Sequence, residues 1–189
     1  MLPLNAANVL TLVRISLIPV LAALLLSTLA ESDLLAAIVF VIASATDALD
    51  GWLARRRSEV TQFGKLMDPL ADKLLITSAL VSLVALYRLD AWVAMVIIAR
   101  ELAVTALRAV AVEQGVVISA SWLGKVKTVL QVAAVFALII WNPSPTWVDV
   151  LVYLAVTVTV ISGVDYFFGL RRRLEVERMR RSAAKTEAG

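Results

Sequence analysis

The chain contains neither cysteine nor histidine. These absences exclude metal sites built on thiolate or imidazole ligands, and they also exclude cysteine nucleophiles and histidine bases. Any bound metal must therefore be held by oxygen ligands, which favours Mg²⁺, Mn²⁺ or Ca²⁺. The formal net charge of +3 is modest for 189 residues, and we expect no nucleic-acid partner.

Long polar segments are also missing, whereas apolar residues abound. Hydrophobic residues make up 61% of the chain, and the mean hydropathy is +0.88. Such values lie far above those of a soluble domain and predict an integral membrane protein. Because about 20 apolar residues cross a bilayer core, we expect an all-α protein with six transmembrane helices and a short interfacial segment at its N-terminus. The expected spans are 9–30, 34–54, 69–87, 91–112, 123–141 and 147–169.

Basic residues are distributed unevenly over the expected loops. They cluster near 55–65, 125–127 and 171–185, whereas the three alternate loops contain only Arg88. By the positive-inside rule, both termini and the loops that carry the clusters lie in the cytoplasm. We therefore expect a multi-pass protein of the cell (inner) membrane whose basic tail contacts anionic lipids. The expected units are a membrane domain at 1–170 and a basic cytoplasmic tail at 171–189.

Four carboxylates interrupt the apolar background in two spaced pairs, Asp47 with Asp50 and Asp68 with Asp72. Ionised groups at membrane depth are costly, and the default interpretation of such residues is functional. The members of each pair are three or four residues apart and share a helix face. Pro69 suits the first turn of the third helix. Two carboxylates from each of two helices are typical of a two-metal site that grips a diphosphate and leaves one carboxylate as a base.

Two other interpretations of the four carboxylates stay open at this point. They could form a buried salt-bridge network with Arg55, Lys65 and Lys73, although purely structural charges inside membranes are rare. They could also form the ion site of a cation transporter or channel. Against a transporter, all four acids are expected near one membrane face rather than the midplane, and the sequence shows no inverted repeat.

The spacing of the acidic motif, D-x-x-D-G-x-x-A-R-x8-G-x-x-x-D-x-x-x-D, resembles the signature of the CDP-alcohol phosphatidyltransferase family. Eight fixed positions at fixed spacing make the match specific, and the resemblance extends to about residue 170. Segments 8–15, 99–108 and 121–128 are most similar to family members whose acceptor is glycerol 3-phosphate. The matching motif positions are Asp47, Asp50, Gly51, Ala54, Arg55, Gly64, Asp68 and Asp72.

The resemblance implies a fold, a reaction and a set of ligands. Family members have six membrane helices, are usually homodimers and open their site to the cytoplasm. In the implied reaction, an acceptor hydroxyl attacks the β-phosphorus of CDP-diacylglycerol, and CMP leaves. Asp47, Asp50 and Asp68 would bind two Mg²⁺ or Mn²⁺ ions, while Asp72 would act as the base and could also contact metal. The CDP-lipid would be bound by Asn8, Thr11, Arg14, Asp47, Asp50, Gly51, Ala54, Arg55 and Gly64.

The acceptor side of the site is expected at the inner ends of the fourth and fifth spans. If the acceptor is glycerol 3-phosphate, its phosphate needs cations, and arginine suits bidentate phosphate contacts. Glu101 is not expected to pair with Arg100, because consecutive helix residues do not face each other. The residues expected to line this pocket are Arg100, Arg108, Lys125 and Lys127.

These assignments have alternatives. Lys125 and Lys127 could be snorkelling membrane anchors, and the polar residues of the first span could serve helix-end hydrogen bonding. Within the family, the acceptor could instead be phosphatidylglycerol, as in a cardiolipin synthase, or an inositol phosphate, as in a phosphatidylinositol phosphate synthase. The cationic set favours a small phosphorylated acceptor, and the segments at 99–108 and 121–128 favour glycerol 3-phosphate.

Overall fold

The computed structural model describes the backbone of residues 6–57, 62–115 and 122–187, and within these ranges all regular structure is helical. The side chains at 6–8, 47–66, 68–69, 177–178 and 180–187 are outside the described set. The predicted all-α class is confirmed for the described part of the chain. Its six helices are α1 (Ala6–Leu25), α2 (Ser32–Arg57), α3 (Gln62–Ala85), α4 (Ala91–Glu113), α5 (Trp122–Ile140) and α6 (Thr146–Glu187).

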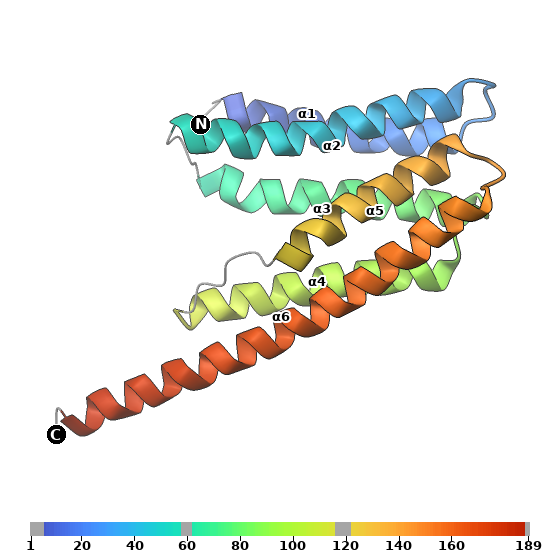
Figure 1. Ribbon diagram of the computed structural model, residues 1–189. Coiled ribbons are helices and arrows are strands. Elements are labelled where there is room, and N and C mark those ends of the chain that lie inside the picture. The colour runs from blue at the N-terminus through green and yellow to red at the C-terminus, as the bar shows by residue number, and fades with distance from the viewer. Residues whose placement is uncertain (1–5, 58–61, 116–121, 188–189) are drawn as a thin grey trace.

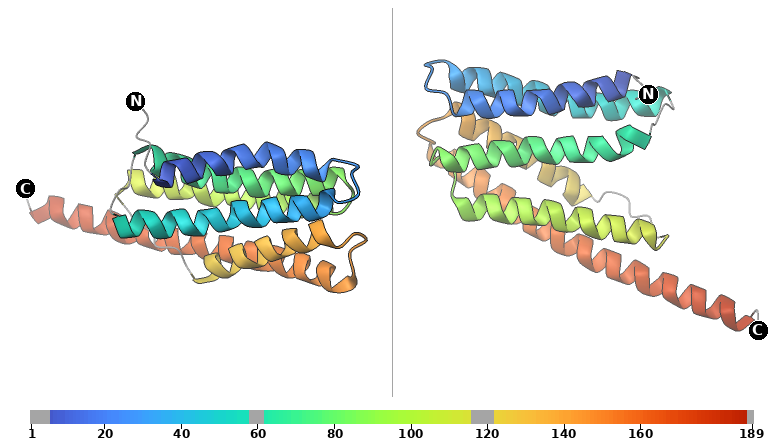
Figure 2. Two further views of the ribbon diagram at one scale, coloured as in Figure 1. Left: turned by 90° about the horizontal axis from the view of Figure 1, so that it is seen from above. Right: turned by 180° about the vertical axis from the view of Figure 1, so that it is seen from behind.

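The helices run up and down in one bundle (Figure 1). Short links join α1 to α2, α3 to α4 and α5 to α6 at one end, as expected for antiparallel neighbours. Helix α1 packs on α2 and α3, α6 packs on α4 and α5, and contacts between α2 and α5 connect the two groups. Both ends of the chain lie at the other end of the bundle, where α6 extends beyond its neighbours (Figure 2). We call this end the terminal end, and the opposite end the link end.

The larger cluster of buried residues in the described part of the chain is built from leucine, isoleucine, valine and alanine, with one buried aromatic ring. Phe40 is fully buried, and Ala36, Ala43 and Ala79 are buried near it in the same cluster. Small residues of this kind let helix backbones approach closely, which is how membrane helices associate. The core therefore depends on close helix contact rather than on bulky side chains alone.

Large apolar side chains are also exposed on all six helices. Exposed apolar surface on every side of a bundle is unfavourable in water and suits a lipid environment. By length and composition, two helices within the described residues qualify as membrane spans, Trp122–Ile140 and Thr146–Val176. The total of six spans stays a prediction. Examples of the exposed side chains are Val20, Leu34, Leu70, Met95, Val129 and Val150.

The three helix boundaries that differ most from the expected ones are the end of α1, the start of α3 and the end of α6. Helix α1 ends at Leu25 because the Ser27 hydroxyl accepts a hydrogen bond from the Leu29 N–H at 3.2 Å, which replaces a helical bond. Helix α3 begins at Gln62, so Pro69 lies well inside it and does not open it. Helix α6 runs unbroken past residue 170 to Glu187. Polarity marks where an apolar stretch ends, but lysine, arginine, glutamine and glutamate are good helix formers and extend a helix beyond it.

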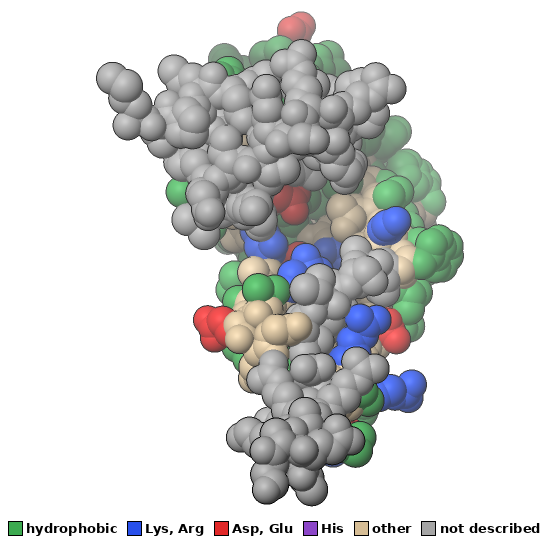
Figure 3. All heavy atoms as spheres, turned by 90° about the vertical axis from the view of Figure 1, so that its left-hand side faces the viewer, with side chains coloured by type: hydrophobic (Ala, Val, Ile, Leu, Met, Phe, Trp, Pro, Cys, Tyr) green, Lys and Arg blue, Asp and Glu red, His purple; other side chains and the backbone are tan. Residues whose placement is uncertain are grey.

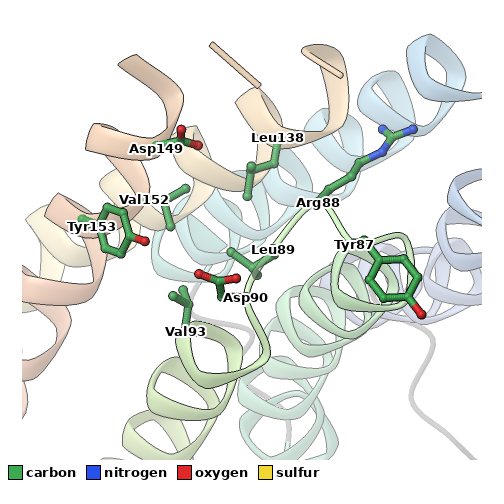
Figure 4. A pocket seen from close by; sticks show the side chains of 9 residues that line it. All are labelled: Tyr87, Arg88, Leu89, Asp90, Val93, Leu138, Asp149, Val152 and Tyr153. Carbon is green, nitrogen blue, oxygen red and sulfur yellow. The ribbon is translucent and has the colours of Figure 1, made fainter. Parts of the chain in front are cut away.

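Arg88 ties three links together at the link end. Its Nη2 lies 2.9 Å from Oδ2 of Asp33 at the start of α2, and its Nη1 donates to the carbonyl of Ile139 in α5 at 3.2 Å. With the Asn142 amide oxygen turned toward it, Arg88 also donates to that oxygen from Nη2 at 3.1 Å and from Nε at 3.3 Å. The guanidinium points away from Asp90 and Asp149, which line a cavity of about 240 Å³ together with Arg88 (Figure 4). Arg88 thus holds the chain ends of α2, α3 and α5 in register.

Replacing Arg88 is expected to destabilise the fold. Arg88→Met leaves the Ile139 carbonyl without this donor and the Asp33 carboxylate without its cation, so we expect a loss of about 2 kcal/mol. Thermal unfolding of the detergent-purified protein measures the change. Arg171→Met is the matched control, because Arg171 forms an exposed pair with Glu175 on α6 and should have little effect. Equal losses in both variants would contradict the structural role of Arg88.

Candidate active site

A cavity of about 400 Å³ opens between α3, α4, α5 and α6 toward the terminal end. Its volume lies in the range of small-molecule sites. Seen from this end, lysine and arginine side chains gather over the middle of the bundle (Figure 3). The polar and charged lining residues are Asp72 and Lys73 from α3, Arg100, Glu101, Thr105 and Arg108 from α4, Lys125, Lys127 and Thr128 from α5, and Tyr166 from α6.

Glu101 binds two cations at the wall of this cavity. Its Oε1 accepts from Nη1 of Arg100 at 3.2 Å and, in a short hydrogen bond, from Nζ of Lys127. All three side chains are largely shielded, and Lys127 is buried rather than exposed as a snorkelling anchor would be. A buried cation is tolerated when a carboxylate neutralises it and its hydrogen bonds are satisfied. We call Arg100, Glu101 and Lys127 the charge triad.

The prediction that Arg100 and Glu101 do not pair is wrong. Their Cβ atoms diverge around the helix, as expected for neighbours. Both side chains are long, however, and their charged ends meet at 3.2 Å. The rule that consecutive residues do not face each other describes where side chains leave the helix. It does not prevent the ends of two long side chains from meeting in the same cavity.

Arg108 and Lys125 differ from the charge triad. The Arg108 guanidinium lies over the Tyr166 ring, 5.8 Å from its centroid, in a cation–π arrangement. Lys125 is exposed at the start of α5. Among the residues whose side chains are described, neither has a carboxylate within ion-pair distance. Their charges are therefore available to an anion that enters the cavity.

Asp72 is half-buried and lies at the junction of two cavities. It lines the cavity described above and also a smaller one of about 90 Å³, which it shares with Ser44, Lys127 and Gln131. A carboxylate here faces the same space as the cationic residues of α4 and α5. The structure thus brings together Asp72, Arg100, Arg108, Lys125 and Lys127, all of which were predicted from the sequence as site residues.

The remaining predicted carboxylates fall on helices that pack together. The backbone of α2 carries Asp47 and Asp50, and that of α3 carries Asp68 and Asp72, and these two helices are in contact. The side chains of Asp47, Asp50 and Asp68 lie outside the described residues, so the geometry of the predicted metal site is not described.

The predicted CDP-lipid residues are described only in part. Thr11 and Arg14 are fully buried on α1, which packs on α2 and α3, and they do not line the large cavity. The two residues lie one turn apart and face the bundle interior rather than a helix end. The side chains outside the described set are Asn8, Gly51, Ala54, Arg55 and Gly64.

Sequence reasoning missed the contribution of α6 to the site. Ser162 accepts a short hydrogen bond from Nη2 of Arg100, and Tyr166 lies under Arg108. The pair Ser162-Gly163 interrupts the apolar run of this helix. That interruption was the available signal, because polar residues within a membrane helix usually face protein.

An all-helical bundle with a cation-lined cavity beside helix-borne carboxylates suits a protein that binds phosphorylated molecules. The family model for CDP-alcohol phosphatidyltransferases matches residues 4–161, and the chain belongs to this family.

Three relatives of this chain come from bacteria. A CDP-diacylglycerol–glycerol-3-phosphate 3-phosphatidyltransferase from Bacillus subtilis (strain 168) is 43% identical, with 86% of this chain and 93% of the relative covered. A protein of the same name from Pectobacterium atrosepticum is 39% identical, over 90% of this chain and 97% of the relative. A probable phosphatidylglycerophosphate synthase from Mycobacterium tuberculosis (strain H37Rv) is 42% identical, over 86% and 79%.

Removing the negative charge of the triad should destabilise the protein strongly. Glu101→Gln keeps the shape of the side chain but removes the carboxylate that Arg100 and Lys127 share, so we expect a loss of about 3 kcal/mol or more. Thermal unfolding in detergent measures it. The control is Glu175→Gln, which breaks an exposed pair and should change stability by less than about 1 kcal/mol.

A second substitution tests the cause of that loss. If the uncompensated charge is responsible, adding Lys127→Met to Glu101→Gln should restore part of the stability, because one buried cation is removed. No recovery in the double variant would mean that Glu101 acts through packing and not through its charge.

Proposed function

We propose that this protein transfers the phosphatidyl group of CDP-diacylglycerol to glycerol 3-phosphate and releases CMP. The observation that carries the proposal is the cavity in which Asp72 meets four cationic residues predicted to bind an acceptor phosphate. The family supports the reaction class, and relatives at 39–43% identity are named for this donor and acceptor.

The charge of the cavity suits a small phosphorylated alcohol. Five cationic side chains line it, Lys73 included, against the two carboxylates Asp72 and Glu101. Arginine and lysine bind phosphate through charge-assisted hydrogen bonds, and Arg108 and Lys125 have their charges available. A surplus of cations disfavours the alternative of a cation transporter, because the cavity would repel its cargo.

In the proposed reaction, the cationic residues of α4 and α5 hold the acceptor phosphate while its hydroxyl faces Asp72. Asp72 accepts the proton from this hydroxyl as its oxygen bonds to the β-phosphorus of CDP-diacylglycerol. The bond between the β-phosphorus and the bridging oxygen breaks, and CMP leaves with the electron pair. The apolar exposed faces of the helices leave the diacyl chains in a lipid environment.

The reaction also requires a divalent metal under this proposal. The donor set predicted for it is all oxygen, from Asp47, Asp50, Asp68 and Asp72, and suits Mg²⁺ or Mn²⁺, with two ions expected. Supporting this, α2 and α3 pack together and carry two of these residues each. A bound metal would neutralise the negative charge on the diphosphate of CDP-diacylglycerol.

We propose that the protein lies in the cell (inner) membrane as a homodimer. Each subunit would cross the membrane six times. The exposed apolar side chains and the two helices that qualify as spans support a membrane location. Both termini, the basic residues after 170 and the cavity lie at the same end of the bundle, which fits a cytoplasmic site (Figure 1). The tail at 171–189 would then contact anionic lipid as the continuation of α6.

The function is tested by CMP release from CDP-diacylglycerol by the purified protein with Mg²⁺ across a panel of acceptors. We expect release that requires glycerol 3-phosphate and stops when the metal is chelated. Release only with phosphatidylglycerol or an inositol phosphate would keep the reaction class and overturn the acceptor. No release with any acceptor, from folded protein with metal present, would contradict the enzyme proposal itself.

Arg108 should act on the acceptor more than on the donor. Arg108→Ala removes a guanidinium whose charge is available to the phosphate, and we expect the KM for glycerol 3-phosphate to rise about tenfold. The KM for CDP-diacylglycerol should change by less than about twofold. Arg171→Ala is the control, because Arg171 lies outside the cavity. Equal increases in both KM values for Arg108→Ala would contradict the assignment of Arg108 to the acceptor phosphate.

A further inference from the structure

Helix α6 holds Arg100 from the side opposite Glu101. Nη2 of Arg100 donates a short hydrogen bond to Oγ of Ser162, which is fully buried. The aliphatic part of the same side chain lies against Gly163, where an added Cβ would come within 3.1 Å of Cγ and 3.6 Å of Nε. A Cβ contact of 3.1 Å is tighter than most Cβ contacts in proteins, so an added Cβ at residue 163 would push the arginine stem away by a few tenths of an ångström.

We propose that Ser162 and Gly163 are positioning residues that set the acceptor-phosphate site through Arg100. The inference rests on the proposed function, because it assumes that the charge triad lines the acceptor pocket. Ser162 fixes the head of the side chain and Gly163 accommodates its stem, so together they determine where the guanidinium lies.

A larger residue at position 163 would displace the aliphatic part of Arg100. Arg100 cannot make room for it without changing its own hydrogen bonds. Its two terminal nitrogens are bound to Glu101 and Ser162, so moving the stem strains one of these bonds. Glu101 also holds Lys127, and a shift is therefore passed to a second cation of the cavity. Each terminal nitrogen of Arg100 still has a second N–H, which is the donor that a phosphate would use.

The same helix supports the second arginine of the cavity. Tyr166 lies four residues after Ser162, on the same face of α6, and its ring lies under Arg108. Arg100 and Arg108 are eight residues apart on α4, so they share a face as well. Helices α4 and α6 pack on each other, and one face of α6 thus supports both arginines.

The test compares two glycines of the same helix. Gly163→Ala should raise the KM for glycerol 3-phosphate at least about threefold and leave the KM for CDP-diacylglycerol nearly unchanged. Gly169→Ala is the matched control, because an added Cβ there meets nothing within 4 Å, and both changes bring the same gain in helix propensity. Gly169→Ala should behave like the wild type in both KM values.

A binding readout accompanies the kinetics. Glycerol 3-phosphate and inorganic phosphate should raise the thermal unfolding temperature of the wild type and of Gly169→Ala, and this rise should be smaller in Gly163→Ala. If Gly163→Ala does not fold, Ser162→Ala tests the inference instead, since it removes the hydroxyl without adding bulk. It should show the same rise in the KM for glycerol 3-phosphate and the same smaller phosphate-induced shift.

The outcomes separate this inference from the proposed function. An unchanged acceptor KM and an unchanged phosphate-induced shift in Gly163→Ala or, if that variant is unfolded, in Ser162→Ala, overturn the positioning role while the transferase proposal stands. Equal increases in both KM values would mean general loss of packing and would also overturn it. If the wild type uses no glycerol 3-phosphate, the proposed function fails, and the phosphate-induced shift alone then decides whether α6 sets an anion site.

Discussion

The carboxylate of Glu101 is the group on which the described part of the site depends. It allows Arg100 and Lys127 to be buried side by side, which without a counter-charge would cost several kcal/mol. It also joins two helices that meet across a cavity. Helix α4 packs on α3 and α6, and α5 packs on α2, α3 and α6, so the contact from Glu101 to Lys127 bridges α4 and α5 where the cavity separates them. The triad keeps one net positive charge facing that space.

The arginines at the two ends of the bundle show how the same side chain serves structure or binding. Arg88 has its donors occupied by Asp33, by the Ile139 carbonyl and, in its favourable orientation, by the Asn142 amide. Its charge is neutralised by Asp33, and its hydrogen bonds hold the links together. Arg108 lies over an aromatic ring, which supports a guanidinium without neutralising it. The difference in partners, rather than the residue type, distinguishes Arg108, whose charge is available to an anion, from Arg88.

The sequence predicted the helical class, the family and four of the cationic residues that line the large cavity. Arg100, Arg108, Lys125 and Lys127 are charged interruptions of apolar helices, which is a strong local signal. Helix ends were harder to predict, as Pro69 shows, because a charged stretch of good helix formers resembles a loop in polarity. The pairing of Arg100 with Glu101 was missed for another reason. It depends on side-chain reach into a shared cavity, and neither spacing nor periodicity contains that information.

The contact of α6 with Arg100 could be recognised only from helix packing and not from the sequence. Gly163 and Gly169 lie six residues apart in one apolar helix and are indistinguishable by composition, yet one lies against Arg100 and the other faces open space. The close contact has an energetic meaning. A guanidinium locked between Ser162 and Glu101 loses its conformational freedom when the protein folds, so that loss does not weaken ligand binding. Lys125 is exposed at the start of α5, and it forms no ion pair with the residues whose side chains are described. If the cavity binds the acceptor phosphate as proposed, the ordered Arg100 would supply geometry and the exposed Lys125 would supply charge, and geometry is what distinguishes one phosphorylated acceptor from another.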